Sequence, residues 1–121
     1  MSLNFYKLVH LFGVLVLFMS LGGATLLAIE GHKASKSTRM LVGIGHGVAL
    51  LVILIAGFGA LAKLGLIWPL PGWVWAKLAL WMLLGAALMI PLRLPQLARP
   101  LWFLLPVLGG LIVWLAIYKP F

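Results

Sequence analysis

The stretch from Leu8 to Ile29 reads LVHLFGVLVLFMSLGGATLLAI and carries no formally charged side chain. An α-helix needs about 20 predominantly apolar residues to cross the hydrocarbon of a bilayer. This run exceeds the apolar part of a usual secretory signal peptide, and further apolar runs follow it. We therefore predict that residues 5–29 form a membrane span that is retained in the protein.

Three more apolar runs predict spans at about residues 40–62, 73–90 and 101–118. Prolines and basic residues mark the connections after the second and third spans: Lys63, Pro69, Pro71, Pro91, Arg93, Pro95, Arg99 and Pro100. An open sheet would leave unpaired edges in lipid, so strands are not expected. The predicted fold class is all-α: an integral membrane four-helix bundle with short loops, formed as a single transmembrane domain over residues 1–121.

The composition points to lipid as the solvent. Hydrophobic residues make up 65% of the 121 residues and charged residues 8%, whereas about 25% charged is usual in soluble domains. Glu30 is the only acidic residue, against nine lysines and arginines. The basic residues sit at the ends of apolar segments, where they meet lipid headgroups. The predicted partner is therefore the bilayer and not nucleic acid. The absence of cysteine excludes disulfides and thiolate metal sites.

Four spans place both termini on one side of the membrane. The first and third connections carry a slight excess of basic residues, which favours termini outside the cytoplasm: Lys33, Lys36, Arg39, Arg93 and Arg99, against Lys7, Lys63, Lys77 and Lys119. Most of the tryptophans and both tyrosines gather on the terminal side, as in an interfacial belt.

Small residues share helix faces with two histidines, which predicts close helix packing in lipid. The two sets are Gly13, Ser20 and Ala24 with His10, and Gly43, Gly47 and Gly57 with His46. Both histidines are therefore expected to point into the bundle.

Polar side chains inside spans are costly, and here they are Lys7, His10, His46 and Lys77. At a rise of about 1.5 Å per residue, His10 lies roughly 8 Å and Lys77 roughly 6 Å from the terminal-side end, while His46 lies roughly 24 Å from it. His10 and Lys77 are thus nearly level, whereas His46 lies much deeper in the membrane. This difference in depth disfavours a single haem iron held by both histidines. Either histidine can instead fix helix packing, and either lysine can extend its amine to the interface as an anchor.

The sequence lacks the residues that several classes of protein require. No paired carboxylates exist for glycoside or protease chemistry. No acidic residue lies within a span, which removes the usual carboxylate of a small proton-coupled transporter. The glycines of residues 43–47 do not follow a strand, so they do not form a nucleotide loop.

Two short motifs resemble a known group of membrane proteins. The sequence from Tyr6 to His10 reads YKLVH, and that from Gly72 to Leu80 reads GWVWAKLAL. Together they resemble the HemJ-type protoporphyrinogen oxidases and the SirB-type proteins, with more distant CopD relatives. The final two spans are closer to the SirB side. The resemblance implies a protein of the bacterial cytoplasmic (inner) membrane.

In HemJ-type proteins a histidine early in the first span and a lysine at the start of the third are associated with haem b. They match His10 and Lys77, which the resemblance therefore implies as cofactor-binding and metal-ligating residues. His46 matches a histidine of SirB-type members and is a third candidate cofactor residue. Thr25 and Leu26 stand where HemJ has an arginine, and residues 86–88 where it has a tyrosine–histidine pair. The resemblance thus implies haem binding more directly than protoporphyrinogen oxidation.

Three functions follow as expectations. The first is a haem b protein engaged in electron transfer or porphyrin oxidation. The second is a non-catalytic accessory subunit, or a bundle that associates with itself or with a larger membrane complex, which the glycine faces favour. The third is a small transporter. The sequence assigns no catalytic residue, so whether the chain is an enzyme stays open at this point.

Overall fold

The computed structural model describes residues 2–31, 35–66 and 68–119. Its elements are α1 (Leu3–Ile29), α2 (Lys36–Leu64), α3 (Gly72–Ala87), α4 (Met89–Arg93), the short 3-10 helix η1 (Pro95–Leu97) and α5 (Ala98–Tyr118). Four helical stretches are long and apolar enough to cross a membrane: α1, α2, α3 with α4, and η1 with α5. The described residues contain no strand. The prediction of an all-α, four-helix integral membrane protein is confirmed.

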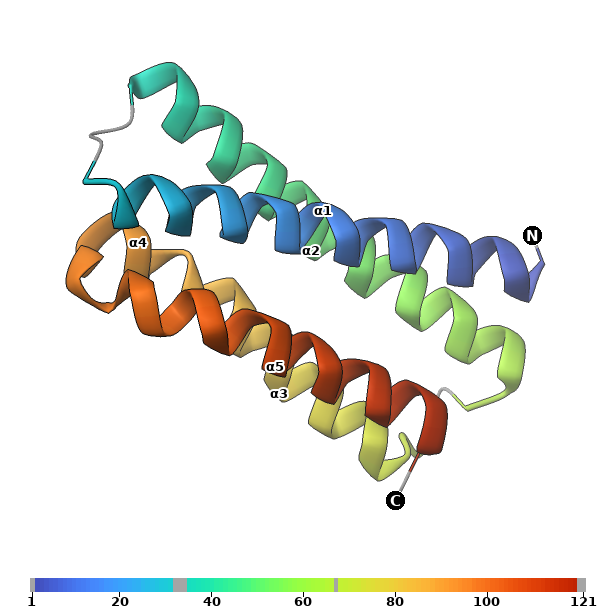
Figure 1. The fold of residues 1–121 in the computed structure, drawn as a ribbon. Helices are drawn as coiled ribbons and strands as arrows, with labels where there is room; N and C mark the ends of the chain where they lie inside the picture. Colours follow the sequence, from blue (N-terminus) through green and yellow to red (C-terminus); the bar gives the residue numbers. More distant parts are fainter. Residues whose placement is uncertain (1, 32–34, 67, 120–121) are drawn as a thin grey trace.

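The bundle has two layers, with α1 beside α2 in one and α3 beside α5 in the other (Figure 1). The two termini lie at one end of the bundle, and α4 lies at the opposite end. The tightest association is between α1 and α2, and α1 also contacts α5 across the layers. We call the end that holds the termini the terminal end.

Both of the first two helices begin earlier than the apolar pattern suggested, because each starts at a polar capping residue. The Ser2 side chain accepts a hydrogen bond from the Phe5 backbone N–H, and the Ser35 side chain accepts one from Thr38. Such caps satisfy backbone donors that the first helical turn leaves free. At the other end of α2, Gly65 adopts φ +72°, the left-handed conformation that favours glycine and ends the helix.

The third span covers the predicted residues 73–90 but contains a break that was not predicted from the sequence. The helix α3 ends at Ala87, Leu88 lies between the two segments, and α4 starts at Met89. Pro91 explains the position, since a proline clashes with the carbonyl four residues earlier and has no N–H to bond it. That carbonyl belongs to Ala87. The proline therefore interrupts the helix before its own position, and the span continues through α4 to Arg93.

The fourth span tolerates two prolines. Arg99 and Pro100 lie in the first turn of α5 and not in the connection where we expected them. A proline in a first turn costs no hydrogen bond, because that turn's N–H groups have no helical partner. Pro106 lies in the helix interior, where it deprives the Trp102 carbonyl of its usual partner.

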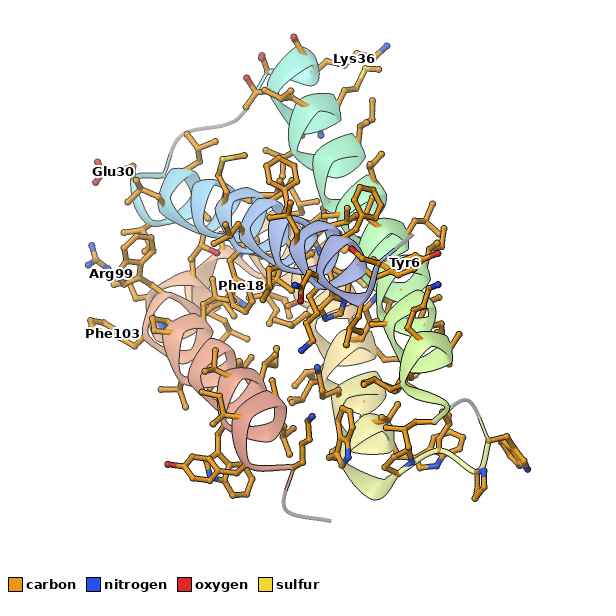
Figure 2. All side chains as sticks on the ribbon, turned by 90° about the vertical axis from the view of Figure 1, so that its right-hand side faces the viewer. Tyr6, Phe18, Glu30, Lys36, Arg99 and Phe103 are labelled. Carbon is orange, nitrogen blue, oxygen red and sulfur yellow. The ribbon has the colours of Figure 1, made fainter. Side chains whose placement is uncertain are left out.

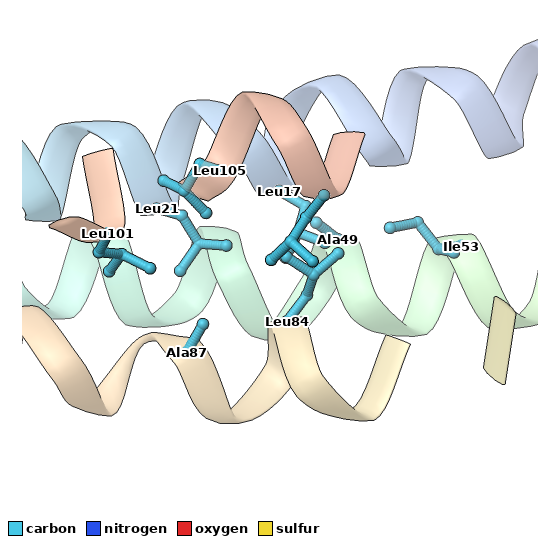
Figure 3. Packing of buried hydrophobic residues seen from close by; sticks show 9 residues of the cluster. Leu17, Leu21, Ala49, Ile53, Leu84, Ala87, Leu101 and Leu105 are labelled. Atoms are coloured by element: carbon cyan, nitrogen blue, oxygen red, sulfur yellow. The ribbon is translucent and has the colours of Figure 1, made fainter. Parts of the chain in front are cut away.

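All four spans contribute apolar side chains to one core (Figure 3). Leu17 and Leu21 of α1 and Leu84 of α3 are almost completely buried. In lipid the gain from this burial is mainly van der Waals contact between well-packed groups, since the hydrocarbon outside is equally apolar. The remaining members of the cluster are Ala49, Ile53, Ala87, Leu101, Leu105 and Leu108.

The glycines have two different environments, so the expectation that they all pack helices together is only partly confirmed. A Cβ on Gly13 would lie 3.0 Å from the Ile53 side chain and 3.4 Å from the Ala49 carbonyl oxygen, where α1 meets α2. A Cβ on Gly43 or Gly47 would meet nothing within 4 Å. These two glycines of α2 therefore do not serve packing within the described chain.

Candidate ligand cavity at the terminal end

A cavity of about 330 Å³ lies between the four spans at the terminal end of the bundle. Its polar lining comes from His10 and Lys7 of α1, Lys77 of α3 and Lys119 just after α5. The rest of the lining is predominantly apolar and aromatic, with Trp73, Trp81, Phe18 and Phe58 among its members. Pockets for small ligands are commonly about 300–1,000 Å³ and apolar with a few convergent polar groups. The cavity has these properties.

His10 is held in one orientation by the backbone of α2. Its Nδ1 lies 2.9 Å from the carbonyl oxygen of Ile53. A carbonyl oxygen can only accept, so Nδ1 carries the proton and donates it. The neutral ring then keeps a lone pair on Nε2. Among the described residues, Nε2 has no hydrogen-bond partner. Because Nδ1 is engaged by the Ile53 carbonyl, Nε2 is the imidazole nitrogen that can act as a ligand.

Gly57 makes this orientation possible. It lies one helical turn beyond Ile53, and a Cβ there would be 3.2 Å from both Nδ1 and Cε1 of His10. This is closer than ordinary van der Waals contact, so the bare backbone leaves the space that the imidazole uses. Gly57 thus positions His10 without contacting anything in the cavity through a side chain of its own.

Lys77 and Lys119 converge on one tryptophan. Their Nζ atoms lie 5.7 Å and 5.3 Å from the centroid of the Trp73 ring. An ammonium within about 6 Å of an indole is attracted to its electron-rich face. Lys119 has φ +47°, the left-handed conformation, and its N–H bonds the Leu115 carbonyl as α5 ends. The amines of two different helices therefore share one aromatic partner at the edge of the cavity.

His46 lies elsewhere, buried between α2 and α3 with 4% of its surface exposed. Its Nε2 donates to the Leu84 carbonyl oxygen at 3.1 Å. In an unbroken helix the Leu84 carbonyl would accept a hydrogen bond from the N–H of Leu88. Here the Leu88 N–H donates to the Ala86 carbonyl oxygen instead. His46 therefore supplies the hydrogen bond that the break in the third span removes.

A second bond of the same kind joins these helices. The Trp81 indole N–H donates to the Leu50 carbonyl oxygen at 3.0 Å. Together, the Trp81 and His46 bonds fix α3 against α2 through backbone carbonyls, at two heights along the interface.

Replacing His46 by leucine is expected to lower the free energy of unfolding by about 1 kcal/mol, because the Leu84 carbonyl loses its donor inside the membrane. Thermal unfolding in detergent measures this against the wild type. His46→Gln, which keeps a donor, should recover part of the loss. A His46→Leu variant with unchanged stability would contradict this role.

The predicted site residues thus divide into two places. Both histidines point into the bundle, as expected, and His10 and Lys77 line one cavity. His46 does not reach that cavity. Lys63, at the end of α2, is exposed and does not line it either.

Sequence reasoning missed Lys119, Trp73 and Gly57. Lys119 was only counted among the basic residues of the terminal side, although its place on the same side as Lys7 and Lys77 was a usable signal. The approach of its amine to Trp73 depends on the backbone conformation at the end of α5, which a residue pattern does not reveal.

Over the described residues, no group of three or more His, Cys, Asp or Glu side chains gathers to hold a metal ion. A metal at this site would therefore depend on one or two protein nitrogens, as haem iron does. Comparison of the chain with models of protein families, with curated proteins and with solved structures finds no match in any of the three.

Proposed function

We propose that this protein binds haem b inside the membrane, that His10 and Lys77 would hold it, and that it serves electron transfer or porphyrin oxidation. The observation that supports the proposal most is the orientation of His10, whose Nδ1 donates to Ile53 while Nε2 keeps its lone pair. Ligating histidines commonly donate their other nitrogen to a backbone carbonyl in this way. The resemblance to HemJ-type proteins points to the same two residues.

The donor chemistry of the cavity fits such a group. His10 offers a neutral imidazole nitrogen, and Lys77 offers an amine that must be deprotonated to coordinate. The apolar lining suits the face of a porphyrin and keeps water from its iron. A bound haem would supply one-electron chemistry, as its iron changes between ferric and ferrous states. Lys7 and Lys119 are cations able to pair with the carboxylates of the porphyrin edge.

The likeness to HemJ- and SirB-type proteins also suggests the bacterial cytoplasmic membrane as the location. Whether haem here serves an enzyme or an electron carrier depends on a substrate site. We favour electron transfer, because residues 86–88 lack the tyrosine–histidine pair of HemJ.

The absorption spectrum of the purified protein, oxidised and then reduced with dithionite, tests this proposal. We expect a Soret band and reduced b-type peaks in the wild type, loss of the bound haem in His10→Ala, and a shifted or lost spectrum in Lys77→Ala. His46→Ala serves as the control and should retain the spectrum, since His46 lies outside the cavity.

A flat visible spectrum from cells supplied with haem would contradict the proposal. It would favour the accessory or self-associating role, which has an observation of its own in the open Gly43 and Gly47. Those glycines lie four residues apart on one face of α2, a spacing that lets two membrane helices approach closely.

A further inference from the structure

The cavity carries more positive charge than haem ligation requires. Lys7, Lys77 and Lys119 come from three different spans and line the same space. Two of these amines share the Trp73 ring. Lys7 and Lys119 are exposed at the terminal end and Lys77 is half-buried, so the three like charges surround one side of the cavity, where an anion would relieve their repulsion.

This chain has no acidic residue able to pair with them. Its single acidic side chain, Glu30, caps the far end of α1, away from Tyr6 and the terminal end (Figure 2). At about 1.5 Å per residue, Glu30 is roughly 35 Å along the helix from Lys7. Over the described residues, no aspartate or glutamate lies near the three lysines, so an anion from outside the protein can pair with them.

The remainder of the cavity sets the kind of anion. Leu11, Val14, Phe18, Leu54 and Phe58 line it with apolar side chains. A small inorganic ion would leave this surface without contact, whereas an amphiphile would place its head at the lysines and its chain along the apolar lining. The volume of about 330 Å³ lies at the lower end of the range for ligand pockets. This volume accommodates a single apolar chain.

We propose that the cavity binds a single-chain anionic amphiphile from the bilayer, with its carboxylate or phosphate held by Lys7, Lys77 and Lys119. Anions bonded by several ammonium groups form charge-assisted hydrogen bonds, which are among the strongest in proteins. Trp73 keeps two of the amines close together before the anion arrives. The site uses the cavity of the proposed function but does not require haem, and Lys7 and Lys119 remain as cations where Lys77 ligates iron.

Equilibrium binding of radiolabelled palmitate to the haem-free protein in a non-ionic detergent tests the proposal. Lysophosphatidic acid tests a phosphate head, and hexadecanol tests a neutral one with a comparable chain. We expect saturable binding of palmitate, of lysophosphatidic acid or of both, at least about tenfold tighter than hexadecanol. The arm that binds more tightly distinguishes a fatty acid from a lysophospholipid as the source.

Variants separate the lysines from the chain pocket. Lys119→Asn removes the charge while keeping a residue that tolerates the left-handed conformation, and Lys7→Gln removes the second cation. The double variant that carries both substitutions is expected to weaken palmitate binding about tenfold or more and to leave hexadecanol binding unchanged. Lys63→Gln, which removes an exposed lysine outside the cavity, is the matched control and should change neither.

Equal affinities for hexadecanol and for both anions would overturn the proposal. It would also be overturned if Lys63→Gln weakened palmitate binding as much as the double variant does. The haem proposal fails or holds independently. A protein that shows no haem spectrum would still be expected to bind palmitate, and the Lys7→Gln, Lys119→Asn double variant should weaken palmitate binding in protein that has never contained haem.

Discussion

Replacing Gly13 by leucine is expected to lower the free energy of unfolding by about 3 kcal/mol, the largest loss we expect from one substitution in the bundle. A Cβ at this position would already lie 3.0 Å from Ile53 and 3.1 Å from Val52, with the Ala49 carbonyl oxygen at 3.4 Å. The last of these is backbone, which cannot turn aside as a side chain can. A whole leucine would force α1 and α2 apart at this contact.

Gly23→Leu is the matched control for this substitution. Gly23 lies on the same helix, and a Cβ there would meet nothing within 4 Å. Both variants gain the better helix propensity of leucine, worth up to about 1 kcal/mol, so the difference between them isolates the packing. Thermal or denaturant unfolding in one detergent measures both. A Gly13→Leu protein as stable as Gly23→Leu would show that α1 and α2 can separate at little cost.

Replacing Gly57 by leucine is expected to lower haem occupancy at least about tenfold, with little loss of stability. The added side chain would occupy the space of the His10 imidazole, which lies 3.2 Å from a Cβ at this position. An imidazole at the end of a side chain can rotate away, unlike the backbone that faces Gly13. It would then leave the Ile53 carbonyl and lose the orientation that aims Nε2 at a ligand. The ligand residue itself would be unchanged.

The measurement is the ratio of Soret to protein absorbance after purification under identical haem supply. Gly47→Leu is the control, because it adds the same side chain to the same helix in open space. Equal haem content in the two variants would mean that the bond from His10 to Ile53 does not govern the site. Loss of haem together with collapse of the fold would make the substitution uninformative, so thermal stability is recorded for each variant.

The sequence predicted those parts of the structure that depend on apolar run length and helix periodicity. The four spans and the inward direction of both histidines follow from these two quantities. The break at Leu88 was not predicted, although a proline acts on the carbonyl four residues before it, which for Pro91 is that of Ala87. The acceptor for His46 is the Leu84 carbonyl, which that rule does not identify.

The cavity was harder to predict from the sequence than the four spans were. Its shape depends on how the spans are tilted and on the backbone conformation of individual residues. The near-equal heights of His10 and Lys77 follow from residue counts, and both line the cavity. The place of Lys119 does not follow from counts, since it rests on a left-handed residue at the end of α5. Gly57 was correctly assigned to a packing face, but its partner proved to be a polar ring and not another helix backbone.

The connections between the spans are short where the structure describes them. Only Leu94 separates α4 from η1, and η1 leads directly into α5. Because the connections are short, little of the protein is exposed to water. A molecule that recognises the four spans therefore approaches them by lateral diffusion within the plane of the membrane. Encounters of that kind are governed by the number of molecules per unit area of bilayer and by lateral diffusion. Raising the expression of a partner in the same membrane would then change occupancy far more than raising the concentration of a soluble one.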